Sequence, residues 1–380
     1  MSRSGRTWIA TILVVAAGIH TFAFFGYAPG DAFLFLKPWY HQLLTSGFSR
    51  PVGNYSPPYV YLLWALTWFD GTLWLVVLFK LLSLLGTILV ASSAAYLLKV
   101  LNRPWELGLL IFALPSVILN SSLLSQADTF WVAPCILAVA ASVKGQPSRV
   151  AAWSGLAFAV KAQAAWIAPF IIFYLFTSKA KLRDWLAAPT VIALANLPAW
   201  ILGWPLPYLL TIYFGQATFV HPKGPSVGNS ASVWTAFGAI SLHAAYSLRW
   251  IGLPLTAIAI VGYWLGIPRR LDARQLVLSA TLSAALVPLF LPMMHERFFI
   301  LADVLAFTYA LAFPSKRSVF LGVLVQVASA WPVFVWAFRL EPSHLIATPL
   351  MIFAVVMYSA ELLRGRRHEA SYEGVRLGSV

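Results

Sequence analysis

Long apolar runs constrain this chain more than any other feature of its sequence. The 380 residues are 60% hydrophobic and only 10% charged, whereas soluble domains carry about 25% charged residues. At roughly 20 apolar residues per span, a chain of this length can cross a bilayer about ten to twelve times. The sequence therefore predicts an all-α polytopic membrane protein. We expect a single transmembrane domain over 1–363 and a basic tail over 364–380.

Basic residues gather in alternate connections between these runs. The clusters are Arg3 and Arg6; Lys99 and Arg103; Lys144 and Arg149; Lys179, Lys181 and Arg183; Arg269, Arg270 and Arg274; Lys316 and Arg317; and the tail. Connections rich in Lys and Arg lie on the cytoplasmic side, so both termini are predicted inside. The first run is longer than a typical signal-peptide core, and we expect it to be a retained helix. The net charge of +14 then reflects topology, and no nucleic-acid partner is expected.

The opposite connections are longer and rich in Trp, Tyr and Pro. Two of them, 29–71 and 205–247, exceed simple turns. Amphipathic aromatic side chains settle at the level of the lipid headgroups. The sequence therefore predicts short helices along the outer membrane surface at 32–47, 59–69 and 205–220, where a lipid-borne substrate can be met.

Acidic residues are few, and three of the 12 lie at predicted outer helix ends. These are Asp31, Asp128 and Glu296, and their neighbours there include Gln126, Lys161, Gln163, His295 and Arg297. Lys161 ends a segment too short to cross the bilayer alone. A charged side chain in that position indicates a water-filled cavity that opens outward.

Each of these residues also has a simpler interpretation. Asp31 can be an interfacial carboxylate in water, and Asp128 can cap the helix that follows it. Arg297 can extend to the headgroups, and Glu296 can do no more than hold Arg297. Lys161 can form a structural ion pair.

Several classes of site are missing from the sequence. We find no Gly-rich phosphate loop, Asp-x-Asp pair, His-x-x-x-His motif or serine nucleophile elbow, and the single Cys135 excludes a disulfide framework. No metal site is predicted. An outward cavity with a few acids and bases fits a sugar donor carried on a lipid phosphate. Its transfer needs a carboxylate to accept the proton of the acceptor hydroxyl and positive groups to stabilise the departing phosphate.

Four motifs, in order, carry a resemblance to a known family. They are Gly30-Asp31 with the loop to Leu63, Ser125-Gln126-Ala127-Asp128-Thr129, Lys161-Ala162-Gln163, and Pro292-Met293-Met294-His295-Glu296-Arg297-Phe298-Phe299. Over about residues 25–310 the chain resembles the C-type superfamily (GT-C) of integral-membrane glycosyltransferases, and among them bacterial relatives of the second mannosyltransferase of the GPI-anchor pathway. Ser125 replaces a Gly of the family pattern, and Ala162 replaces a Pro.

The resemblance implies a role for each matching residue. Asp31 would be the catalytic base. Asp128 is the second predicted catalytic residue, and Asp128 and Gln126 would position Asp31 or bind sugar hydroxyls. The donor phosphate would contact Lys161, His295 and Arg297. The remaining substrate-binding positions are Tyr55, Tyr59, Gln163 and Glu296.

The resemblance also implies an activity and a location. A sugar, with mannose favoured, would pass with inversion from a polyprenyl phosphate to a hydroxyl of a lipid or glycan acceptor. The active site would face outward from a bacterial inner membrane. No cofactor is expected, and the family leaves a divalent metal open.

Two other classes of function stay open. A transporter or flippase of a lipid-linked sugar would place charged groups near the bilayer midplane, within repeats, whereas here they are predicted near one surface. A membrane acyltransferase would need a His-acid pair, which His295 and Glu296 suggest only faintly.

Overall fold

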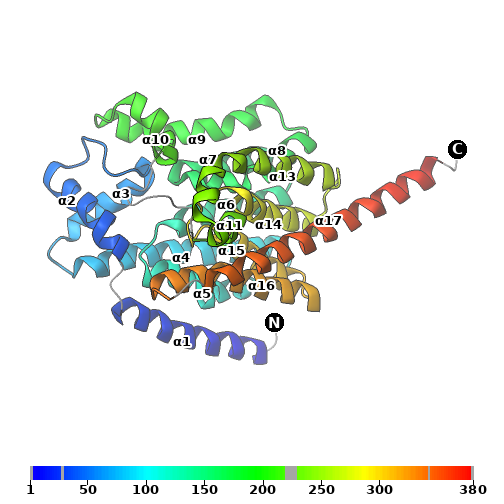
Figure 1. Cartoon of the computed structure of the whole chain (residues 1–380), viewed down its shortest axis with the longest axis horizontal. Helices are drawn as coiled ribbons and strands as arrows, with labels where there is room; N and C mark the ends of the chain where they lie inside the picture. The colour runs from blue at the N-terminus through cyan, green and yellow to red at the C-terminus, as the bar shows by residue number, and fades with distance from the viewer. Residues whose placement is uncertain (1–2, 27–29, 219–228, 341–342, 378–380) are drawn as a thin grey trace. The chain divides into compact units, whose positions relative to one another are not determined.

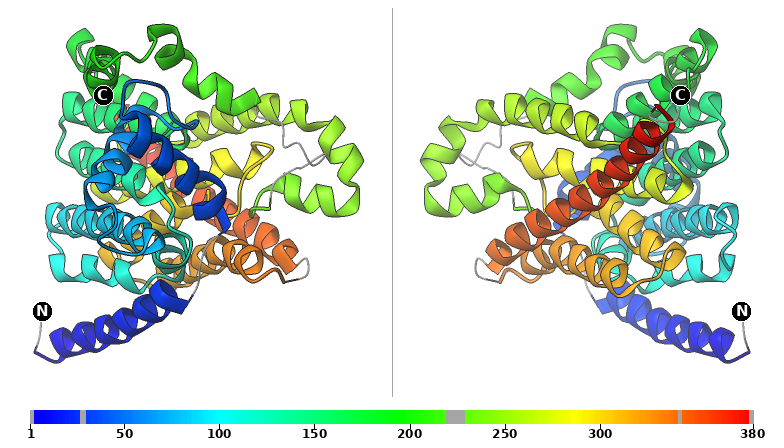
Figure 2. Two further views of the ribbon diagram at one scale, coloured as in Figure 1. Left: turned by 90° about the vertical axis from the view of Figure 1, so that its left-hand side faces the viewer. Right: turned by 90° about the vertical axis from the view of Figure 1, so that its right-hand side faces the viewer.

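The computed structural model describes residues 3–26, 30–218, 229–340 and 343–377, and these residues fold into helices without a β-strand. Figure 1 shows the elements in chain order, and both views in Figure 2 show helices joined by loops. Because the bilayer core offers no water, a spanning backbone must satisfy its own polar groups, and helices do so.

Among the described residues, six helices are long and apolar enough to cross a membrane. They are Ser4–Gly26, Leu75–Val100, Arg249–Gly266, Ala273–Phe290, Lys316–Ala337 and Ala347–Arg364. A seventh candidate is the bent pair Trp105–Ala113 and Pro115–Leu123, whose halves meet at 60°. The predicted all-α polytopic class is confirmed. The number of full-length helices is below the expected ten to twelve because the runs at 128–143, 162–177 and 300–312 form shorter apolar helices.

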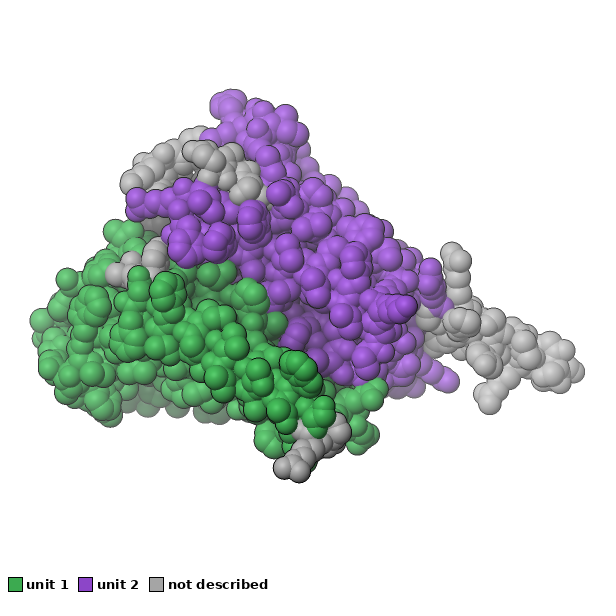
Figure 3. Space-filling view, turned by 90° about the horizontal axis from the view of Figure 1, so that it is seen from below, with its two compact units in different colours: residues 1–140, 148–165, 181–223 green, residues 141–147, 166–180, 224–380 purple. Residues whose placement is uncertain are grey.

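The chain divides into two compact units, which Figure 3 colours green and purple. Unit 1 comprises residues 1–140, 148–165 and 181–223, and unit 2 comprises 141–147, 166–180 and 224–380. The elements built mainly from unit 1 are α1 (Arg3–Gly26), η1 (Ala32–Leu36), α2 (Lys37–Ser46), α3 (Pro57–Leu66), η2 (Thr67–Phe69), α4 (Leu75–Val100), η3 (Trp105–Ala113), α5 (Pro115–Ile118), η4 (Leu119–Leu123), α6 (Asp128–Val143), α7 (Pro147–Val160), η5 (Ala162–Ile167), α9 (Leu182–Ile201) and α10 (Leu206–Thr218). Those of unit 2 are α8 (Ala168–Thr177), α11 (Val233–Ile240), α12 (Leu242–Ser247), η6 (Arg249–Ile251), α13 (Gly252–Gly266), α14 (Ala273–Phe290), α15 (Ile300–Ala312), α16 (Lys316–Ala337), η7 (Ser343–Ile346) and α17 (Ala347–Leu377).

Helix α4 is the central support of unit 1. It packs against η3, η4 and α1. Its fully buried Lys80 donates hydrogen bonds from Nζ to the carbonyl oxygens of Ala23 (2.8 Å) and Phe24 (2.7 Å). The last carbonyls of a helix have no partner within the helix, and the negative end of its dipole favours a cation. Lys80 therefore closes the end of α1 a few residues before Asp31.

Helices form where the sequence predicts surface helices. Residues 32–47 contain η1 and α2, residues 59–69 fall in α3 and η2, and residues 205–220 contain α10. They pack through aromatic side chains: the Phe48 and Trp204 rings stack at 5.1 Å, and Trp204 Nε1 donates to the Phe48 carbonyl at 2.8 Å. Gly53 has φ +63°, and a Cβ there would overlap the Trp39 ring, so this turn requires glycine. Their placement at the membrane surface stays a prediction.

The core of unit 2 consists of α14, α15, α16 and α17. Each of these helices packs against the next one in the chain, and α14 also packs against α17. Capping boxes start two of these helices, at Asp272 before α14 and at Ser315 before α16. Helix α17 continues through Leu377, so helix extends into the segment predicted as a tail from residue 364. That 1–363 acts as a single domain stays a prediction.

Candidate functional site

Asp31 lies at the start of η1, just beyond the end of α1. Its side chain is half-buried, and it makes no capping hydrogen bond to η1. Gln126 Nε2 donates to Asp31 Oδ2 at 3.0 Å. The resemblance predicts that Gln126 either positions Asp31 or binds sugar, and this bond is the contact a positioning residue makes.

The backbone before Gln126 positions the residue so that its side-chain amide reaches Asp31. Ser125 has φ +56°, in the left-handed region, and the Gln126 N–H bonds to the Asn120 carbonyl at 2.9 Å, a pattern that ends helices. Ser83 of α4 also donates to the Gln126 carbonyl at 2.9 Å. The left-handed conformation favours glycine, which gives a physical reason for the Gly that Ser125 replaces in the motif.

Asp128 begins α6 and is fully buried. Three side chains donate to its carboxylate: Lys161 Nζ at 2.5 Å and Trp131 Nε1 at 3.0 Å to Oδ1, and Asn120 Nδ2 at 3.1 Å to Oδ2. A buried carboxylate is stable only when it is paired and hydrogen-bonded. Asp128 satisfies that condition, and its contacts match those of a structural anchor.

Lys161 follows α7 and is 3% exposed. Besides its ion pair with Asp128, its Nζ lies 5.0 Å from the centre of the Tyr55 ring, which is within the range of a cation–π contact. The rings of Tyr55 and Tyr59 are 5.4 Å apart. Burial, followed by the nearby Tyr55 and Asp128, raises the pKa of Tyr59 above its ordinary value. The predicted residues Tyr55, Tyr59, Asp128 and Lys161 thus form one cluster in unit 1.

A cavity of about 300 Å³ lies in unit 1, and its wall includes Ala32, the residue after Asp31, but not Asp31 itself. Its polar lining comes from Lys37, His41 and Asp70, and its aromatic lining includes Phe33 and Trp74. Lys37 and His41 are four residues apart on α2, and residues with that spacing share a helix face.

Asp70, the acid that lines this cavity, is hydrogen-bonded to a buried tyrosine. Tyr40 Oη donates to Asp70 Oδ1 at 2.8 Å. Burial and then this bond raise the pKa of Tyr40 to about 12, so the hydroxyl keeps its proton at neutral pH. The sequence predictions did not include this cavity. The one signal in the sequence is the pairing of a lysine with a histidine one turn later in an aromatic loop that is predicted to lie outside.

The His-Glu-Arg motif lies in unit 2, after a turn in which Met293 has φ +59°. Glu296 is 2% exposed; Arg297 Nη1 lies 2.5 Å from its Oε1, and His295 Nδ1 lies 3.8 Å from its Oε2. Burial would raise the pKa of Glu296, but Arg297 and His295 together lower it to about 2. Glu296 therefore holds Arg297, as the simpler interpretation of the sequence expects, while the His295 side chain stays 58% exposed.

Gln163 is half-buried in η5, and its Oε1 has no hydrogen-bond partner among the described residues. Among all the residues that the structure describes, no three His, Cys, Asp or Glu side chains lie close enough together to hold a metal ion.

The predicted site residues thus form two sets. Asp31, Tyr55, Tyr59, Gln126, Asp128, Lys161 and Gln163 belong to unit 1, and His295, Glu296 and Arg297 belong to unit 2. Each set is defined within its own unit, and a chamber common to both stays a prediction.

Comparison with known proteins adds no family to this description. No protein-family model matches the chain, and no curated protein matches it significantly. The resemblance described above therefore depends on its four motifs.

Proposed function

We propose that this protein is a membrane glycosyltransferase that moves a sugar from a polyprenyl phosphate to a hydroxyl of a lipid or glycan acceptor. The observation that carries the proposal is a half-buried, oriented carboxylate in unit 1 that is followed directly in the chain by a residue lining an amphipathic cavity. Asp31 is oriented by Gln126, and the cavity begins at the next residue, Ala32.

In the proposed reaction, Asp31 accepts the proton of the acceptor hydroxyl. The acceptor oxygen bonds to the anomeric carbon as the bond from that carbon to the phosphate oxygen breaks, so the configuration inverts. The lipid phosphate leaves as an anion and needs no general acid. A base in this role typically contributes about 10²- to 10⁴-fold to the rate.

The cavity lining matches the parts of such a donor. Lys37 and His41 would contact the phosphate, Trp74 and Asp70 the sugar ring and its hydroxyls, and Phe33 the first isoprene units. A volume of about 300 Å³ is at the lower end of small-molecule pockets. We assign the phosphate contact to Lys37 and His41 because the amine of Lys161 is committed to Asp128 at 2.5 Å.

The unit 2 motif has a place in the same proposal. Glu296 keeps the guanidinium of Arg297 fixed, and a preorganised positive group stabilises a departing phosphate. We retain His295 and Arg297 as phosphate contacts, and mannose as the first donor sugar to test.

The experiment is transfer of labelled mannose from a purified polyprenyl phosphate donor to an extracted lipid or glycan acceptor, using the full chain in detergent. The proposal expects labelled product with the wild type and a loss of about 10²-fold or more with Asp31→Asn. Wild-type transfer unaffected by Asp31→Asn would exclude Asp31 as the base. A full panel of donors that yields no product would refute the proposal.

One observation favours the transporter alternative. Helices Trp105–Ala113 and Pro115–Leu123 form a bent pair in the chain, and transporters bind substrates at interrupted helices. Flipping of a labelled polyprenyl-phosphate sugar in reconstituted vesicles, without a change in its chemical form, would support that function instead.

A further inference from the structure

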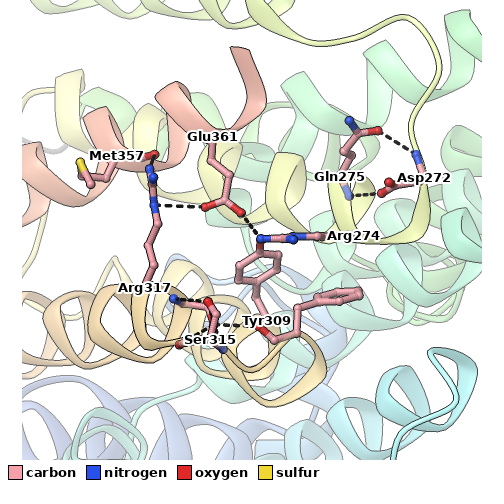
Figure 4. A network of polar contacts seen from close by, with 10 residues as sticks. Asp272, Arg274, Gln275, Tyr309, Ser315, Arg317, Met357 and Glu361 are labelled. Carbon is pink, nitrogen blue, oxygen red and sulfur yellow. Dashed lines mark hydrogen bonds and ion pairs between the residues drawn. The ribbon is translucent and has the colours of Figure 1, made fainter. Parts of the chain in front are cut away.

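A second cavity, of about 350 Å³, lies in unit 2 between the start of α14, the start of α16 and the middle of α17. Its wall includes Arg274, Arg317, Arg364 and Glu361. Figure 4 shows Arg274 and Arg317 converging on Glu361 from different helices. The cavity shares no residue with the site proposed for glycosyl transfer.

One carboxylate is shared by several donors in this cavity. Glu361 Oε1 lies 2.6 Å from Arg274 Nη2 and accepts the Tyr309 hydroxyl at 2.5 Å, while Oε2 lies 3.5 Å from Arg317 Nε. The second acid, Asp272, accepts a hydrogen bond from the backbone N–H of Gln275 at 2.7 Å as part of the cap of α14. Arg364 has an exposed side chain and makes no ion pair among the described residues. The cavity therefore holds more positive than negative charge.

The three arginines share one depth along their helices. Arg274 is the second residue of the candidate span Ala273–Phe290, Arg317 is the second residue of Lys316–Ala337, and Arg364 follows the apolar part of α17, a helix that continues to Leu377. Span ends lie at the level of the lipid headgroups. Helices α14 and α16 also begin here, so the positive ends of two helix dipoles reinforce the arginines.

One apolar side chain lines this cavity, and exposed apolar side chains lie close in the sequence to its arginines. Leu278, one turn after Arg274, lines the cavity itself. Phe320 and Leu363 lie within one turn of Arg317 and Arg364 and are 54% and 44% exposed. A ligand with an anionic head and an apolar body would contact both the arginines and these apolar side chains, whereas a soluble anion would contact only the arginines.

We infer that this cavity binds the phosphodiester headgroup of an anionic membrane phospholipid, such as phosphatidylglycerol. Arg274 and Arg364 contact the phosphate, since guanidinium groups bind phosphate through paired hydrogen bonds. Arg317 contributes charge while its Nη2 bonds to the Met357 carbonyl at 2.8 Å. Glu361 competes with the lipid for Arg274. Basic pockets between membrane helices bind anionic headgroups in this way.

The test measures lipid retention by native mass spectrometry of the purified full chain, with phosphatidylglycerol and phosphatidylcholine of equal acyl length. We expect selective retention of phosphatidylglycerol. Arg274→Gln and Arg364→Gln should each weaken it roughly fivefold, since each basic residue contributes about 1 kcal/mol. Arg103→Gln is the matched control, because Arg103 is an exposed arginine just beyond another span, in unit 1. It should change retention little.

Two further arms separate the explanations. Glu361→Gln should strengthen phosphatidylglycerol binding, because Arg274 loses its competitor; unchanged or weaker binding in a variant that keeps the wild-type unfolding midpoint would overturn the inference. Soluble glycerophosphate should fail to displace the lipid at matched concentration. Equal displacement would identify a site for free phosphate, and equal retention of both lipids by wild type would leave only a structural ion-pair network.

Discussion

Asp31 and Asp128 are both acids at predicted outer helix ends, yet the structure gives them different surroundings. Asp128 is fully buried, with donors from Asn120, Trp131 and Lys161. Asp31 is half-buried, receives a hydrogen bond from Gln126 and precedes Ala32, which lines a cavity. Residue type and position along a helix could not separate these roles. The exposure of the two carboxylates differs, and in our proposal the half-buried Asp31 is the base and the fully buried Asp128 is the anchor.

The largest effect should come from Asp31→Asn. Removing the base should lower sugar transfer by about 10²- to 10⁴-fold, with little change in the thermal unfolding midpoint. The control is Glu106→Gln, which removes an acid of unit 1 whose ion-pair partner, Arg6, is 4.0 Å away. If both variants lose activity equally, the contrast between Asp31 and Asp128 has no catalytic meaning.

Asp128→Asn should act on stability instead. The substitution leaves Lys161 buried without its counter-charge, and breaking such a pair costs about 3 kcal/mol or more of unfolding free energy. Denaturant unfolding in mixed detergent micelles measures the loss. Adding Lys161→Met to this variant should restore part of it, because the double variant buries no lone charge. A stable Asp128→Asn protein with greatly reduced transfer would reverse the two roles.

Lys37→Gln tests the role of the unit 1 cavity that Lys37 lines. Hydrogen bonds to charged groups contribute about 1.5–3 kcal/mol, so the KM for the lipid-phosphate donor should rise about tenfold, with a smaller change in kcat. The comparison is Lys144→Gln, on the opposite predicted side of the membrane. A normal KM in Lys37→Gln would remove this residue from the phosphate site.

A smaller effect is expected from Ser125→Gly, which changes the support of Gln126. Ser125 has φ +56°, and its buried hydroxyl has no hydrogen-bond partner among the described residues. A left-handed conformation costs a non-glycine residue about 1–2 kcal/mol, whereas glycine loses more entropy on folding. We expect a net gain of about 1 kcal/mol in a chemical unfolding titration. A clear loss would mean that Ser125 has a function beyond its backbone conformation.

Glu296 extends the comparison to unit 2, and its contribution to stability should not depend on pH near neutrality. Its folded pKa, about 2, is below the ordinary 4.5. The ionised form is therefore favoured by folding, so its contribution is complete above about pH 4.5 and is lost as the pH falls toward 2. The difference in melting temperature between wild type and Glu296→Gln should stay constant from pH 8 to 5 and shrink below pH 4.5. A difference that changes between pH 8 and 6 would contradict this assignment.

The helical class could be predicted because apolar composition leaves few alternatives in a membrane. The number of full-length helices could not, because an apolar run does not reveal where a helix breaks. The run over 105–120 contains a 60° bend before Pro115. The run beginning near 128 forms a helix of only 16 residues, which contains Pro134.

The site was predictable to the extent that motif residues are neighbours in the sequence. Glu296 and Arg297 are adjacent, and their ion pair followed from that spacing. A structural ion pair of Lys161 was one of two open interpretations, but its partner, Asp128, was not predicted, because 33 residues separate the two. Lys37, His41, Asp70 and Trp74 were not selected, because their convergence depends on how the start of α4 returns to α2.

Helix α4 supports both Asp31 and its hydrogen-bond partner Gln126. Lys80 ties down the end of α1, which leads into Asp31, and Ser83, one turn later, ties down the carbonyl of Gln126. Lys80 and Ser83 lie within one turn of the same helix, so a substitution that breaks α4 at this turn would loosen the supports of the acid and of its amide partner together.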